Sequence, residues 1–141
     1  MGKAKQKKQP AKPNYPQCGK CGDCHAPPAA ECRKYNGWPN YETWAVKLWI
    51  DNEEGSYKHW KEQAKGAFEA AGRAKKDYFS QSEQARYDLA DALKDQIADD
   101  EKPDLVASMY SDLLSAALQE VEWSHIADAL LEEVEGYEST R

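Results

Sequence analysis

The sequence predicts an all-α protein, a compact bundle of about five helices with a disordered, basic, cysteine-rich appendage at the N-terminus. Three observations predict this class. Apolar residues recur at helical spacing through residues 35–135, no stretch alternates as a half-buried strand does, and all four cysteines precede residue 35. We therefore divide the chain into a basic tail (1–17), a cysteine segment (18–34), a helical domain (35–135) and a C-terminal tail (136–141).

The central helix is predicted over residues 40–52. Pro39 disfavours the α conformation at the residue before it, so the helix begins after this proline. Asn40 is a good N-cap, and Glu42 complements the helix dipole in the first turn. Most of the remaining surface of this helix is apolar, which is typical of a helix that packs against several neighbours.

The aromatic residues of this region have two interpretations. They either anchor the core or form an exposed recognition surface, and we favour the core because aromatic residues at helical spacing usually pack inward. The residues expected to have this structural role are Trp38, Asn40, Tyr41, Glu42, Thr43, Trp44, Leu48 and Trp49.

The motif Asn-Gly-Trp-x-Asn-Tyr-Glu-Thr-Trp-x-Val-x-Leu-Trp-x-x-Asn spans residues 36–52. It resembles the signature of a family of small, functionally uncharacterised proteins carried by phages and other mobile elements. The resemblance is dense over residues 35–60 and continues more loosely to about residue 134. It implies a genetic context, and it assigns neither an activity nor a catalytic residue.

The second and third helices have their own end signals. Gly55 and Ser56 are expected to end the first helix and begin the second, which returns antiparallel to it as far as about Gly72. Ser80 and Glu83 form a capping box for the third helix. The apolar stripe of the third helix consists of Leu89, Ala90, Leu93 and Ile97.

The fourth helix is expected to open at Lys102-Pro103-Asp104, and the fifth to follow a short break near Glu122 and end at Gly136. One side of the fourth helix is apolar through Leu105, Met109, Leu113, Ala117 and Val121. The apolar residues of the fifth helix are Trp123, Ile126, Ala127, Leu130, Leu131 and Val134.

The clustered cysteines favour a metal site, because the thiols of a cytosolic chain stay reduced. Cys-x-x-Cys-Gly has the shape of a zinc knuckle, in which one tight turn supplies two thiolates. We predict zinc bound by four thiolates, with a histidine as the substitute for the third. These residues are Cys18, Cys21, Cys24 and Cys32, with His25 as the alternative ligand.

Three other interpretations of the cysteine segment stay open. Cys-x-x-Cys-x-x-Cys also begins an iron–sulfur run, although its fourth cysteine usually comes sooner. Cys21 to His25 matches the attachment pattern of c-type haem, which requires export, and no export signal is present. The segment could also be a metal-free thiol segment.

Charge is divided unevenly along the chain, whose net charge is −6. Residues 1–34 hold eight Lys and Arg against two Asp and Glu, whereas residues 80–141 hold four against sixteen. The basic tail is either a spacer or an electrostatic contact to nucleic acid. Its lysines are Lys3, Lys5, Lys7, Lys8 and Lys12. We expect a cytoplasmic protein without a membrane segment, because no apolar run reaches the length of a spanning helix.

The third helix has an acidic side opposite its apolar stripe, formed by Asp88, Asp91, Asp95 and Asp99. This side is either a solvated surface or a surface that imitates nucleic acid and docks on a basic partner. No nucleophile motif or phosphate-binding loop is present, and His59 and His125 are isolated, so we expect no enzyme and no small-molecule substrate.

The preferred hypothesis is a non-enzymatic accessory protein of a phage or other mobile element that binds a host or phage protein. One alternative is a zinc-dependent nucleic-acid-binding accessory protein. The other is an acidic mimic of nucleic acid that inhibits a host enzyme.

Zinc binding is directly testable. Protein purified without added metal should contain about one zinc per chain, because the four cysteines supply the usual ligand set. Elemental analysis measures the metal. Four freely titrating thiols without metal would contradict the prediction.

Overall fold

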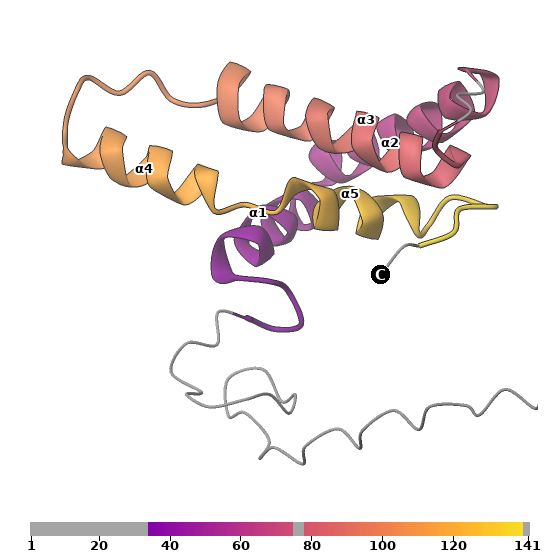
Figure 1. Ribbon diagram of the computed structural model, residues 1–141. Coiled ribbons are helices and arrows are strands. Elements are labelled where there is room, and N and C mark those ends of the chain that lie inside the picture. The colour runs from indigo at the N-terminus through magenta and orange to yellow at the C-terminus, as the bar shows by residue number, and fades with distance from the viewer. Residues whose placement is uncertain (1–33, 75–77, 140–141) are drawn as a thin grey trace, which may run out of the picture. The chain divides into compact units, whose positions relative to one another are not determined.

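The computed structural model describes residues 34–74 and 78–139, which form an all-α fold (Figure 1). No helix in these two ranges is long and apolar enough to cross a membrane. An isolated β-bridge joins Tyr35 to Trp38. The helices are α1 (Tyr41–Asn52), α2 (Glu54–Ala74), α3 (Gln81–Lys94), the π-helical turn η2 (Asp95–Asp100), α4 (Met109–Gln119) and α5 (Trp123–Leu131).

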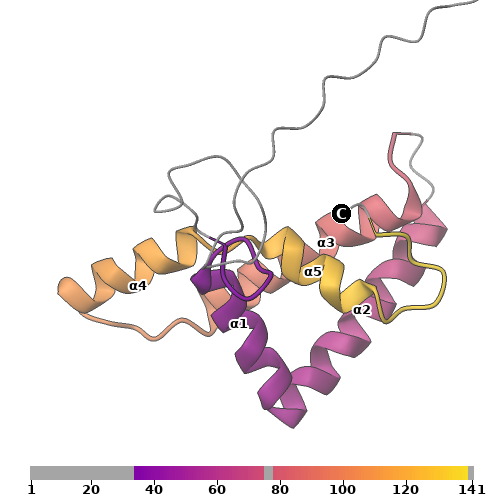
Figure 2. The same cartoon turned by 90° about the horizontal axis from the view of Figure 1, so that it is seen from below.

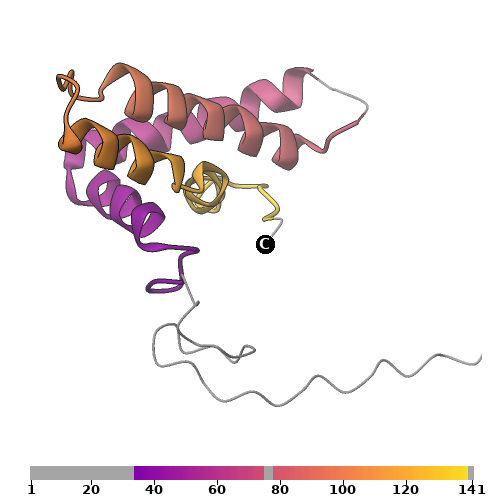
Figure 3. The same ribbon diagram turned by 60° about the vertical axis from the view of Figure 1, so that its left-hand side comes forward.

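The core lies where α2, α3 and α5 pack together (Figures 1 and 3). Ala64 of α2 and Ala85 of α3 are fully buried, and such small side chains allow helices to approach closely. Trp60 and Leu89 belong to the same buried cluster. The predicted apolar stripes of α3 and α5 are confirmed, and their fully or nearly fully buried members are Leu89, Ala90, Leu93, Ile126, Ala127, Leu130 and Leu131.

A tight turn leads the chain into α1. Asn36 and Gly37 both have positive φ, and the backbones of Tyr35 and Trp38 exchange two hydrogen bonds of 2.8 and 2.9 Å across them. Positive φ at both central residues is the requirement of a type I′ turn, for which Asn-Gly is the preferred pair. Asn40 then caps α1 as predicted, because its side chain accepts a hydrogen bond from the Thr43 amide.

A buried polar network, which we call the Asn40–Thr43 clasp, ties α1 to the link between α4 and α5. The Thr43 hydroxyl donates to Asn40 Oδ1 at 2.6 Å and accepts the Glu122 amide at 2.9 Å. Asn40 Nδ2 donates to the Glu120 carbonyl at 2.6 Å. Both clasp side chains are buried, so their hydrogen bonds replace contacts with water that burial removed.

The junction of α1 and α2 differs from the prediction. Gly55 and Ser56 lie inside α2, and Glu53 alone separates the two helices. The Glu53 carboxylate accepts the amides of Gly55 at 3.1 Å and Ser56 at 2.5 Å, so it caps α2 in place of Ser56. A single residue is too short to reverse the chain, and Figure 2 shows α1 and α2 meeting as a V rather than as an antiparallel hairpin.

The capping box of α3 is confirmed, since Ser80 and Glu83 exchange both predicted hydrogen bonds. The end of this helix was not predicted. Its final turn widens into η2, where the Glu101 amide donates to the Gln96 carbonyl five residues earlier. The wider turn changes which side chains lie above one another.

The prediction for α4 is wrong in two respects. The helix begins at Met109, not near Pro103, because Ser108 and Ser111 form a capping box there. Its predicted apolar side is also largely uncovered. Leu105, Met109 and Leu113 are exposed, no residue of α4 is buried, and Val121 reaches the core only after the helix has ended.

Residues 137–139, which the sequence analysis assigns to a C-terminal tail, contact α3 and α5. The Tyr137 hydroxyl and the Ser139 hydroxyl both donate to the buried carboxylate of Asp128 on α5. The Glu138 amide donates to Ser82 of α3 at 3.0 Å. Burial, and then the hydrogen bond to Asp128, raise the pKa of Tyr137.

Replacing Thr43 by Val should destabilise the protein by about 1–3 kcal/mol, because the Glu122 amide loses its buried acceptor. Urea denaturation measures the loss. Thr43→Ser is the control, since it keeps the hydroxyl. Amide hydrogen exchange at Glu122 should accelerate in the Val variant and not in the Ser variant. Equal protection in both would contradict a role for the clasp.

The Tyr137–Asp128 contact predicts a loss of stability at alkaline pH. The raised folded-state pKa means that the neutral phenol stabilises the fold at all pH values below about 10, the unfolded value, and that this contribution disappears as pH rises further. Tyr137→Phe should lower stability at pH 7 and remove part of the alkaline loss. Parallel pH profiles for the two proteins would refute this.

Candidate functional site

The predicted metal ligands and the lysine tail lie outside the described residues. This applies to Cys18, Cys21, Cys24, His25 and Cys32 and to the lysines between Lys3 and Lys12. Within 34–74 and 78–139, no three His, Cys, Asp or Glu side chains are placed to hold a metal ion. Zinc binding therefore stays a prediction from the sequence.

Among the aromatic residues of the central motif, Trp38 is partly buried against the core as expected, and the others differ from the prediction. Trp44 is half-buried, and Trp49 is 74% exposed. The buried residues of α1 are Thr43 and Ile50, because the helix is covered on one side only. Tyr35, Tyr41 and Trp44 instead contact one another in edge-on and tilted arrangements, with ring centroids 4.8–5.4 Å apart.

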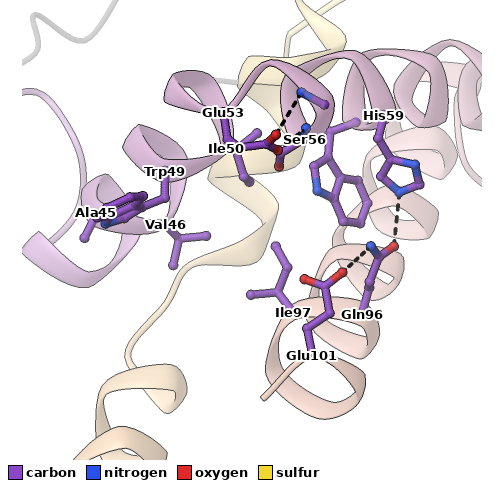
Figure 4. Close-up of a pocket in the computed structure, with 12 residues that line it drawn as sticks. Ala45, Val46, Trp49, Ile50, Glu53, Ser56, His59, Gln96, Ile97 and Glu101 are labelled. Atoms are coloured by element: carbon purple, nitrogen blue, oxygen red, sulfur yellow. Dashed lines mark hydrogen bonds between the residues drawn. The ribbon is translucent and has the colours of Figure 1, made fainter. Parts of the chain in front are cut away.

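The V between α1 and α2 holds a cleft of about 620 Å³, which we call the α1–α2 cleft (Figure 4). Val46 and Ile50 of α1 lie on one side, and Ile97 of η2 lies opposite them. The buried Trp60 of α2 also contributes to the lining. Exposed Trp49 stands at one end, so the cleft is an apolar surface with an uncovered aromatic ring beside it.

A chain of hydrogen bonds forms the polar wall of the cleft. Gln96 Oε1 lies 3.1 Å from His59 Nε2, and Gln96 Nε2 donates a hydrogen bond of 2.7 Å to the Glu101 carboxylate (Figure 4). The π-helical turn presents both Gln96 and Ile97 to this site. Turns of this kind recur at functional sites.

Charge at the cleft is acidic. The carboxylates of Glu53 and Glu101 belong to its lining, and neither lysine nor arginine does. Both residues are exposed, so their attraction for a cation is short-ranged and weakens with added salt. The cleft therefore suits an apolar group that carries a positive charge nearby.

In the described residues of the cleft, Ser56 and His59 are not paired with each other. Ser56 and His59 both line the cleft, yet within the described part of the chain the imidazole is hydrogen-bonded to Gln96 and not to the serine hydroxyl. A nucleophilic serine requires a base within hydrogen-bond reach.

A second hollow, of about 670 Å³, lies between α2 and the turn after α5. Lys61 and Glu133 pair at 2.9 Å within its lining. This hollow is also acidic, because its lining holds two lysines and four glutamates, but it lacks an exposed tryptophan. The α1–α2 cleft is the better candidate for binding.

The predicted acidic side of the third helix is exposed throughout, at Asp88, Asp91, Asp95 and Asp99. Asp88 accepts a hydrogen bond from Gln84 at 2.7 Å. Asp95 and Asp99 belong to η2, so the α-helical wheel that aligned all four does not apply to these two. The cleft residues Gln96 and Glu101 could not be predicted, because their position depends on the π-helical turn.

Comparison with known proteins identifies a family for the helical domain. No curated protein and no solved structure is significantly similar to the chain. One family model matches residues 31–135, which is most of the chain and includes every residue of the α1–α2 cleft. The chain therefore belongs to a family of unknown function, DUF7249.

Proposed function

We propose that this protein is a non-enzymatic accessory protein of a phage or other mobile element, and that the α1–α2 cleft receives a segment of a host or phage protein. The observation that carries the proposal is the exposed Trp49 beside an apolar cleft with acidic margins. Tryptophan is enriched among the residues that dominate binding energies at protein interfaces.

The chemistry of the cleft specifies the partner segment. Val46, Ile50 and Ile97 provide an apolar surface for one or two aliphatic or aromatic side chains. Glu53 and Glu101 attract lysine or arginine beside those side chains. The expected partner segment is therefore an amphipathic helix or strand with a basic margin, and its binding should weaken with added salt.

The appendage adds a separate activity to this proposal. Four cysteines and a basic tail suit a zinc-stabilised contact to nucleic acid, which would bring the partner protein to DNA or RNA. The exposed aspartates of α3 and η2 give weaker support to the alternative of an acidic mimic, because charged side chains on a solvent-exposed face need no partner.

Trp49→Ala should reduce capture of the partner protein at least about tenfold, the loss of a typical interface hot spot. Full-length protein is used to capture partners from a host-cell lysate, with and without nuclease, and the retained proteins are quantified by mass spectrometry. Because Trp49 is largely exposed, the free energy of unfolding should change by less than about 0.5 kcal/mol.

Tyr78→Ala is the matched control. This aromatic ring is 91% exposed and follows the far end of α2, about 20 residues from the cleft wall. Partners that survive nuclease and are lost only from the Trp49 variant support the proposal. Equal capture by both variants would refute the role of the cleft, and loss of all partners with nuclease would favour nucleic-acid binding.

A further inference from the structure

The outer face of α4 is an uncovered apolar surface separate from the α1–α2 cleft. Tyr110 is 70% exposed and Leu113 is 61% exposed, and Met109 and Ala116 lie on the same face. The opposite face of α4, which includes Ser115 and Leu118, lines two hollows together with residues of η2. Figures 1 and 2 place α4 at the margin of the fold.

We propose that this face binds a second copy of the chain, with two α4 helices packed antiparallel around a two-fold axis at Leu113. A two-fold interface requires a surface that complements itself. The α4 face meets this requirement, because its large residues lie at one end and its small residues at the other.

The spacing gives the expected contacts. Met109 precedes Leu113 by four residues, and Ala116 follows it by three. Tyr110 precedes Leu113 by three residues, and Ala117 follows it by four. Antiparallel pairing about Leu113 therefore places Met109 against Ala116 of the second copy, and Tyr110 against Ala117. Large side chains opposite small ones allow helix surfaces to interdigitate.

The size of the face agrees with a reversible dimer. The helix is about 16 Å long, and its exposed face carries Met109, Tyr110, Leu113 and Ala116. Two copies would bury on the order of 1,000 Å², the lower limit for a specific interface. We expect exchange between monomer and dimer rather than a permanent dimer.

Charge distinguishes a second copy from a basic partner. The margin of the face carries Asp112, and α4 contains neither lysine nor arginine. Two copies bring like charges together, so salt should strengthen self-association by screening them. A basic partner protein on the same face would respond to salt in the opposite direction.

The test is sedimentation velocity of the full chain under reducing conditions, from about 1 to about 500 µM, a range that brackets a small interface. The wild type should shift from monomer to dimer, and added salt should favour the dimer. Leu113→Asp should weaken dimerisation at least about 30-fold, whereas Tyr78→Asp should not change it. A wild type that stays monomeric would overturn the proposal.

A charge exchange tests the antiparallel register and does not depend on Leu113. Met109→Glu and Ala116→Lys should each weaken the dimer, and the two changes in one chain should restore it, because each Glu then faces a Lys of the other copy. Both positions are exposed, and each new charge complements the dipole of its end of α4. A combined variant no stronger than the single variants would refute this register.

Discussion

The Asn40–Thr43 clasp is the constraint on which the position of α1 depends. Few side chains of α1 are buried, so apolar packing alone holds this helix weakly. The clasp satisfies two buried side chains and joins them to the backbone at Glu120 and Glu122, about 80 residues along the chain. By fixing the start of α1 against the α4–α5 link, it also fixes one wall of the α1–α2 cleft.

Helix ends and core stripes were predictable where the signal is local. Ser80 with Glu83, and Asn40 with the first turn of α1, are contacts within three residues, and the α3 and α5 stripes follow one helical period. The widening at Asp95 was not predictable, because the same residues also fit a continued α-helix. The cleft could not be predicted either, since it depends on where α1, α2 and η2 meet in space.

The wrong predictions of burial for residues of α1 and α4 have a common cause. Helical spacing shows that Trp49 and Leu113 lie on apolar sides of their helices, but it cannot show whether a neighbour covers those sides. The domain places its alanine-rich core between α2, α3 and α5 and leaves α1 and α4 partly uncovered. The motif of residues 36–52 is thus divided between a structural part, which includes Asn40 and Thr43, and a surface part, which includes Trp49.

The contact between Tyr137 and Asp128 has a practical consequence for handling the protein. Proteolytic trimming just after Gly136 would remove both hydroxyl donors to Asp128 and the amide donor to Ser82. A buried carboxylate without those donors favours opening of the end of α5, and the opened segment would invite further digestion. Affinity tags are therefore better separated from residue 139 by a spacer, and intact mass deserves checking before any measurement of stability.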